Sequence, residues 1–115
     1  MFLCEAALGT QRFITRDGEV GHSDKDPVSA HKANSCLAVG NTEPDAANNI
    51  TVKFDGKDVV VPQGPVKPNP LVAEKCVEGS SSSFAQSEYL VYREDQVTIR
   101  YVLKMRFETP GGHWH

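Results

Sequence analysis

The sequence lacks both the long apolar run of a membrane protein and the clustered cations of a nucleic-acid-binding protein. No stretch approaches the roughly 20 consecutive apolar residues that a transmembrane helix needs, and residues 1–8 lack the cationic start of a signal peptide. The formal net charge is -3, with lysine and arginine spread along the chain. Because a phosphate backbone is bound mainly by concentrated positive charge, we expect neither a membrane nor a nucleic acid to be a direct partner of this segment.

Cysteine is scarce and irregularly spaced. Cys4, Cys36 and Cys76 are the only three, and no C-x-x-C pair suggests a zinc site or a redox couple. His113 and His115 flank a tryptophan near the C-terminus, but a metal site needs three or four fixed ligands. We therefore expect reduced thiols in an intracellular compartment, and no metal.

Strand-like patterns dominate, and no segment has the period of a confident amphipathic helix. Residues 2–8 are apolar apart from one glutamate and predict a strand buried on both faces. Residues 50–54 alternate, Asp55–Gly56 supplies a turn and residues 59–61 follow, which predicts a hairpin. Residues 97–107 alternate apolar with mainly cationic side chains, which predicts a long strand with a solvated cationic face. The coarse prediction is a mostly antiparallel sheet assembly.

Loops are predicted where proline, glycine and polar residues gather. Residues 15–35 are polar and show neither the helical nor the strand period, and residues 62–83 combine prolines with a run of serines. Residues 93–96 suit a four-residue hairpin loop. Residues 109–115 are expected to be a disordered tail, so the predicted domain spans residues 1–108.

Glu88 is the most informative residue, because it places a carboxylate inside a strand pattern that is otherwise apolar on both faces, residues 84–92. Under strand alternation Leu90 shares its face. Enclosing an ionised carboxylate among such neighbours costs several kcal/mol unless partners or a ligand satisfy it, so Glu88 is a candidate functional residue. The alternative is a structural carboxylate paired with Arg93 or Arg100.

Five ordered segments together resemble the C-terminal half of the poly(ADP-ribose) polymerase catalytic domain. They are Met1–Gly9, the loop Leu37–Asp45, the hairpin Asp55–Gly64, Ser87–Tyr92 and Tyr101–Lys104. Several motifs in the same order are far more specific than one short pattern. The resemblance implies an α+β ADP-ribosyltransferase fold, mostly antiparallel β, represented here by a C-terminal portion.

The resemblance also implies a function. Members of this family use NAD as co-substrate, without a metal, and transfer ADP-ribose to proteins or onto existing ADP-ribose chains. Their catalytic signature is a His, a Tyr and a Glu, and Glu88 matches the Glu. It would hydrogen-bond the 2′-hydroxyl of the nicotinamide-side ribose, stabilise the oxocarbenium-like transition state and polarise the acceptor hydroxyl. A nuclear location and a role in DNA repair are implied as well.

By the same resemblance, the family's His, its nicotinamide-stacking tyrosines and its regulatory helical region match no part of this chain. All three tyrosines of the sequence follow Glu88. We therefore expect the 115-residue chain alone neither to bind NAD well nor to turn it over. The alternative function is that of a non-catalytic, β-rich module that binds a protein through the segments 37–45 and 62–83.

Overall fold

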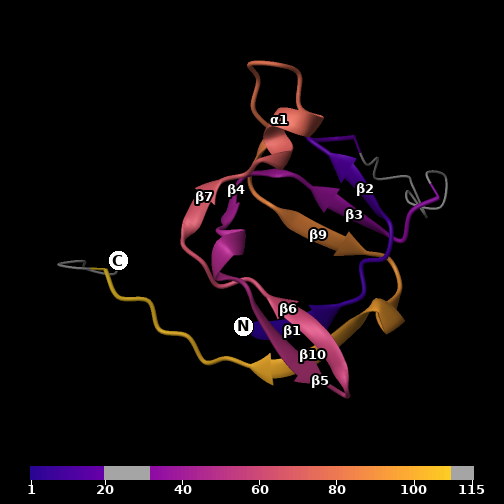
Figure 1. The fold of residues 1–115 in the computed structure, drawn as a ribbon, viewed down its shortest axis with the longest axis vertical. Coiled ribbons are helices and arrows are strands. Elements are labelled where there is room, and N and C mark those ends of the chain that lie inside the picture. Colours follow the sequence, from indigo (N-terminus) through magenta and orange to yellow (C-terminus); the bar gives the residue numbers. More distant parts are fainter. Residues whose placement is uncertain (20–31, 110–115) are drawn as a thin grey trace.

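The computed structural model describes residues 1–19 and 32–109, and short strands make up most of its regular structure (Figure 1). In chain order the elements are β1 (Phe2–Ala6), β2 (Gln11–Ile14), β3 (Ser35–Ala38), β4 (Gly40–Pro44), the 3₁₀ turn η2 (Ala46–Asn48), β5 (Ile50–Phe54), β6 (Lys57–Val61), β7 (Val66–Pro68), α1 (Leu71–Lys75), β8 (Phe84–Gln86), β9 (Glu88–Val91), the 3₁₀ turn η3 (Glu94–Gln96) and β10 (Val97–Val102). Much of the predicted loop 15–35, most of the predicted tail 109–115 and all four histidines lie outside the described residues.

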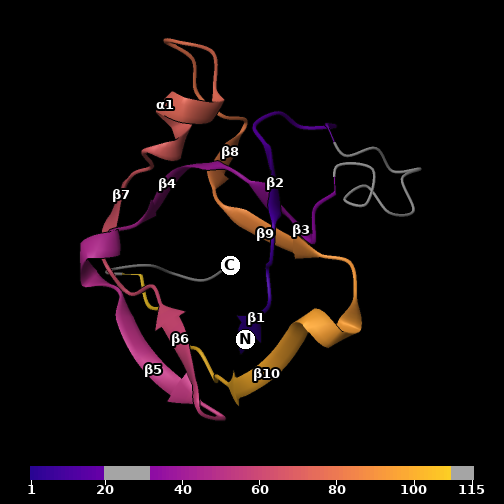
Figure 2. The ribbon, with the colours of Figure 1, turned by 45° about the vertical axis from the view of Figure 1, so that its right-hand side comes forward.

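The described strands form four small sheets rather than one (Figure 2). β1 pairs antiparallel with β10, and β5 with β6. β3 lies between β2, its parallel partner, and β9, its antiparallel partner. β4 lies between antiparallel β7 and parallel β8. The prediction of a mainly β structure with little helix is therefore confirmed in a mixed form, while the α+β class and the C-terminal portion stay predictions.

β3 carries the centre of the core. All four of its residues are buried, and Val39 directly after it is fully enclosed. The cluster on one face consists of Ile14, Cys36 and Ala38, with Ala33, Phe84 and Leu90 partly buried against it. Because β3 has a neighbouring strand on each edge, its backbone groups are paired and its apolar side chains can be enclosed. The same pairing holds β9 in place.

The hairpin β5–β6 forms where the sequence predicts it. Its strands pair from Ile50 with Val61 to Phe54 with Lys57. The two turn residues, Asp55 and Gly56, have φ of 51° and 77°. Positive φ at both positions is the geometry of a two-residue hairpin turn whose twist matches that of the strands. The Asp-Gly signal is therefore confirmed in its local detail.

β1 exists where it was predicted, but the prediction that it is buried on both faces is wrong. Phe2 is 60% exposed and Leu3 is 44% exposed. The cause is its pairing: β1 bonds to β10 alone, and the described part of the chain leaves much of this two-stranded sheet open. Burial on both faces of a strand requires cover from both sides.

β10 ends at Val102, earlier than predicted; Leu103 still bonds Met1 through its backbone, and residues 104–109 continue without regular structure (Figure 1). The predicted solvated cationic face is wrong at Arg100. Its Nε donates to Glu5 Oε2 at 2.7 Å, its Nη2 lies 3.0 Å from Asp55 Oδ2, and its guanidinium lies 4.7 Å from the centre of the Phe54 ring. Arg100 thus joins the hairpin β5–β6 to the sheet β1–β10.

The predicted loop 62–83 contains two short regular elements, β7 and α1. β7 pairs with β4 alone, and an edge strand is where a proline is tolerated. α1 begins directly after Pro70, whose φ of -62° already suits a helix start. Prolines therefore shorten the elements of this segment without excluding them.

Three further predictions about local structure are wrong for one shared reason. Residues 37–45 are not a loop but contain the end of β3 and all of β4. The predicted strand 84–92 divides at Ser87 into β8 and β9. Residues 93–96 do not close a hairpin, because β9 pairs with β3 whereas β10 pairs with β1. In each case the backbone pairs with strands distant in sequence, which a local pattern does not report.

Candidate active site

Glu88 is the first residue of β9 and lies opposite Ala38 of β3. Strand alternation places it on the face of Leu90, which packs against the core cluster. Its side chain is nevertheless exposed, so the predicted enclosure among apolar neighbours is wrong for the described residues. The reason is its position: β9 is an edge strand of its sheet, and Glu88 lies at the end of that strand.

The alternative reading of Glu88 as half of a structural ion pair finds no support. Arg93 Nη2 lies 2.8 Å from Asp95 Oδ2, and Arg100 is held by two other carboxylates, Glu5 and Asp55. Among the described residues no hydrogen bond or ion pair involves the Glu88 side chain. Its carboxylate is therefore an acceptor that the described residues leave unpaired.

The backbone just before Glu88 is fixed by a contact with β4. Gly40 N donates to Ser87 Oγ at 2.9 Å. A Cβ atom on Gly40 would lie 2.2 Å from Ser87 N and 2.3 Å from the carbonyl carbon of Gln86. Only glycine permits this approach of two backbones. The sequence analysis missed this role, although a glycine within an apolar strand pattern is a signal for close backbone approach.

Gly40 is itself held from its other side by Asn69. Asn69 Nδ2 donates to Gly40 O at 2.8 Å, and Asn69 Oδ1 accepts from Leu71 N at 3.0 Å, at the start of α1. Asn69 is only 6% exposed. A buried amide that has both of its polar groups bonded rigidifies its surroundings, so the loop before α1 is tied to β4.

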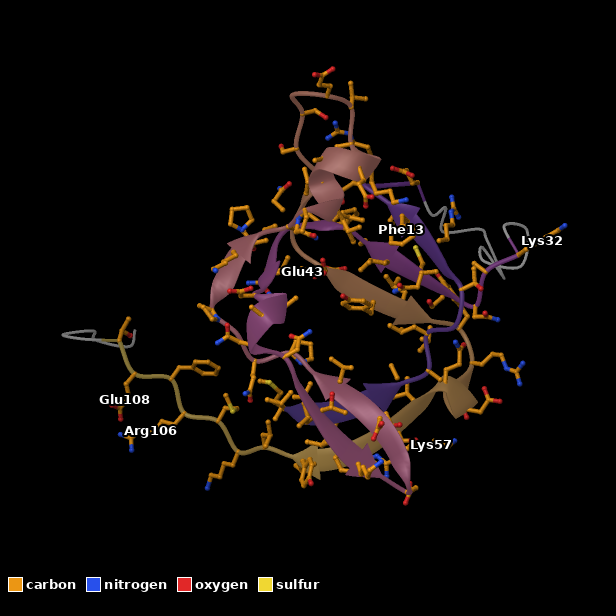
Figure 3. The ribbon with its side chains drawn as sticks, viewed as in Figure 1. Phe13, Lys32, Glu43, Lys57, Arg106 and Glu108 are labelled. Carbon is orange, nitrogen blue, oxygen red and sulfur yellow. The ribbon has the colours of Figure 1, made fainter. Side chains whose placement is uncertain are left out.

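Tyr89, next to Glu88, points to the opposite face of β9. Its hydroxyl donates to Glu43 Oε1 at 3.1 Å, and Figure 3 shows Glu43 beside the start of β9. Burial, followed by the Glu43 charge, raises the pKa of Tyr89 to about 12. Tyr89 therefore stays a neutral donor at neutral pH. It also lines a cavity of about 460 Å³ together with Gln86 and Ser87, on the side away from Glu88.

Within residues 1–19 and 32–109 no group of His, Cys, Asp and Glu side chains could hold a metal ion. His113 and His115 lie outside the described residues. All three cysteines are free, and burial raises the pKa of the Cys36 thiol. No described helix has the length and apolar character that crossing a membrane would require.

The chain belongs to the poly(ADP-ribose) polymerase catalytic domain family, which it matches over residues 1–107. One relative is the mouse protein mono-ADP-ribosyltransferase PARP3, 47% identical over 105 residues that cover 91% of this chain and 17% of the relative. The human protein of the same name is 43% identical over the same coverage. Poly [ADP-ribose] polymerase 1 of Xenopus laevis is 31% identical, over 97% of this chain and 9% of the relative. The chain thus spans less than a fifth of the length of these relatives.

Proposed function

We propose that this chain supplies the catalytic carboxylate, Glu88, of an NAD-dependent ADP-ribosyltransferase. Membership of the family supports the reaction class. The observation that carries the role of Glu88 is that this residue, which resembles the family's catalytic Glu, lies within residues 1–107 that match the family model; it also lies on a strand paired to the buried core, and its exposed carboxylate has no partner among the described residues. A carboxylate kept unpaired on a rigid element remains available to a ligand, whereas a structural one is satisfied by a neighbour.

Transfer of ADP-ribose from NAD would use such a carboxylate. Positive charge develops on the ribose as its bond to nicotinamide breaks, and a fixed negative charge stabilises that state. Glycoside hydrolysis uses a carboxylate in the same way. Glu88 would also accept a hydrogen bond from the ribose 2′-hydroxyl, which orients the sugar. During transfer it would polarise the hydroxyl of an acceptor.

We further propose that the 115-residue chain is inactive alone. Five apolar side chains are buried among the described residues, namely Ile14, Cys36, Leu37, Ala38 and Val39. Glu88 is exposed, so nothing described here excludes water from it, and electrostatic stabilisation weakens in water. The proposed partners are NAD and acceptor proteins or ADP-ribose chains. The proposed setting, a nucleus and DNA repair, follows only from family membership.

The non-catalytic alternative, a protein-binding module, retains one favourable observation. Large apolar side chains are exposed on β1 and β10, with Phe2 at 60%, Ile99 at 55% and Val102 at 74%. Such a surface is typical of a face that contacts other polypeptide. It is equally what one portion of a larger catalytic domain would present, so the match to a catalytic-domain family favours the enzyme.

The test uses a chimera in which this chain replaces the aligned segment of the mouse relative. Incorporation of labelled ADP-ribose from NAD into acceptor protein is measured, and gels distinguish single units from chains. We expect Glu88→Gln to keep the shape and remove the charge, and so to abolish transfer and any elongation that the parent chimera shows, with NAD binding largely intact. Glu78→Gln, at an exposed glutamate without a described partner, is the matched control. Undiminished transfer by the Glu88→Gln chimera would refute the proposal.

The isolated chain gives a second test. Calorimetric titration of the 115 residues with NAD should show no binding in the micromolar range. Tight binding by the chain alone would contradict the proposal that it is inactive because its site is open to solvent. That result would leave the role of Glu88 in the chimera unaffected.

A further inference from the structure

We propose that Asn69, Gly40 and Ser87 form a positioning relay that sets the orientation of Glu88. The inference rests on the proposed function, because it concerns how the catalytic carboxylate is held. Asn69 Nδ2 bonds Gly40 O at 2.8 Å, Gly40 N bonds Ser87 Oγ at 2.9 Å, and Ser87 precedes Glu88. The relay joins the segment before α1 to the catalytic strand, and the three residues lie far apart in sequence.

Ser87 stands where the chain passes from the sheet β7–β4–β8 to the sheet β2–β3–β9. Up to Gln86 the chain is in β8 and pairs parallel with β4, and from Glu88 it is in β9 and pairs antiparallel with β3. Ser87 belongs to neither strand. The direction in which the chain leaves this residue decides where the Glu88 side chain points. The hydrogen bond from Gly40 N therefore holds Ser87, a residue whose backbone is not fixed by the pairing of either strand.

Glu88 depends on this backbone more than an ordinary glutamate does. Its carboxylate has no described hydrogen bond that could hold it, so its location follows from the position of its own Cα and from rotamer preference. Glu88 is the first residue of β9 and its pairing with Ala38 is the last of that register, so a shift at Ser87 acts on the least supported end of the strand. Misplacement of a reacting group by about 1 Å can cost on the order of a hundredfold in rate.

Gly40 links Asn69 to Ser87 because its backbone packs directly against the backbone of Gln86 and Ser87. A Cβ there would lie within 2.7 Å of three backbone atoms of Gln86 and Ser87, so the two chains are already in contact. Asn69 is 6% exposed and bonds Gly40 O on one side and Leu71 N on the other. The segment before α1 therefore acts as a support for the active strand and not only as a connection.

The main experiment compares serine variants in the chimera. Ser87→Ala removes the acceptor for Gly40 N, whereas Ser87→Thr keeps a hydroxyl at the same place. We expect Ser87→Ala to lower kcat about tenfold or more, with the KM for NAD changed less than about twofold, and Ser87→Thr to recover most of kcat. Ser83→Ala is the matched control, since the Ser83 side chain is exposed and makes no described bond.

Thermal unfolding of each chimera corrects kcat for the fraction folded. An unchanged corrected kcat in Ser87→Ala, or a threonine variant as impaired as the alanine variant, overturns the relay. The proposed function is judged separately, because it fails only if Glu88→Gln remains active. If Ser87→Ala does not fold in the chimera, Ser87→Cys replaces it, because the thiol keeps most of the side-chain volume but is a weaker acceptor for Gly40 N; there too an unchanged corrected kcat overturns the relay.

The contact itself is measured in the chain as it exists. In the 115-residue chain, exchange of the Gly40 amide hydrogen should accelerate at least about tenfold in Ser87→Ala and stay slow in Ser87→Thr. Equal exchange rates in the parent chain and in Ser87→Ala would show that no bond constrains Gly40, and would overturn the relay without bearing on Glu88.

Discussion

Replacing Asn69 by alanine should cost the chain a large share of its stability. The change removes the donor to Gly40 O and the acceptor for Leu71 N, at a site where Asn69 is 6% exposed. A buried polar group left without its partner costs about 1–3 kcal/mol. Two groups lose their partner, but Leu71 N lies in the first turn of α1 and Gly40 O keeps its second lone pair, so neither loss need reach its maximum. We therefore expect the free energy of unfolding to fall by about 2–4 kcal/mol in total.

The measurement is urea unfolding of the 115-residue chain, followed by far-ultraviolet circular dichroism. Asn49→Ala is the matched control, because that side chain is exposed and makes no described bond, and it should change the free energy of unfolding by less than about 0.5 kcal/mol. Amide hydrogen exchange at Leu71 reports whether the loss is local to the start of α1.

Asn69→Asp separates the two bonds of Asn69. The carboxylate keeps an acceptor for Leu71 N but turns a charged oxygen towards Gly40 O, so its folded pKa should be raised. A raised folded pKa means that stability is full at low pH, where the acid can donate to Gly40 O, and falls as pH rises through that pKa. Equal stability of Asn69→Ala and the parent chain, or a pH-independent Asn69→Asp, would refute the reasoning.

Two pH-dependent predictions follow from the described hydrogen bonds. Burial and Glu43 raise the pKa of Tyr89 to about 12. Its contribution to stability should therefore be complete below about pH 10 and be lost as pH rises towards 12. An ultraviolet titration of tyrosinate formation should lose its highest step in Tyr89→Phe, and persistence of that step would refute the assignment. The hydrogen bonds from Lys67 and Ala47 N lower the pKa of Asp45. The contribution of Asp45 to folding stability is therefore present above the ordinary carboxyl pKa range and is lost as pH falls through the lowered pKa. Asp45→Asn should make the free energy of unfolding, measured with urea, depend less on pH in the acid range, and an unchanged pH dependence would contradict this.

The parts of the fold that sequence patterns predict are those fixed by neighbouring residues. The hairpin at Asp55–Gly56 is an example, because positive φ at two successive positions is a local requirement that these residue types meet. The pairing of β1 with β10 is the opposite case, since Ala6 and Val97 lie at opposite ends of the chain. No periodicity identifies which strand a given strand will join.

The candidate site divides in the same way. Glu88 is a candidate from the sequence, because a carboxylate inside an apolar strand pattern is unusual, but the enclosure and the single strand that the pattern predicted are both wrong, and its catalytic role stays a prediction. Its supports could not be found: Ser87 is one of several serines near position 80, and Asn69 lies in a proline-rich segment predicted as a loop. Both acquire a role only once β4 brings Gly40 between them.

The exposure of Glu88 weakens the electrostatic stabilisation that its charge can provide, and Coulomb's law gives the size of this loss. Two unit charges about 4 Å apart interact by about 1 kcal/mol in bulk water and by about 4 kcal/mol at the effective dielectric constant of a partly enclosed protein site. The difference of about 3 kcal/mol corresponds to roughly a hundredfold in rate. A carboxylate that the described residues leave open therefore has the right charge and a fixed strand, but lacks most of the electrostatic advantage that an enclosed site provides. The proposed inactivity of the isolated chain would therefore follow both from missing cover over the β9 face and from the family's His and nicotinamide-stacking tyrosines, which match no part of this chain, and not from Glu88 itself.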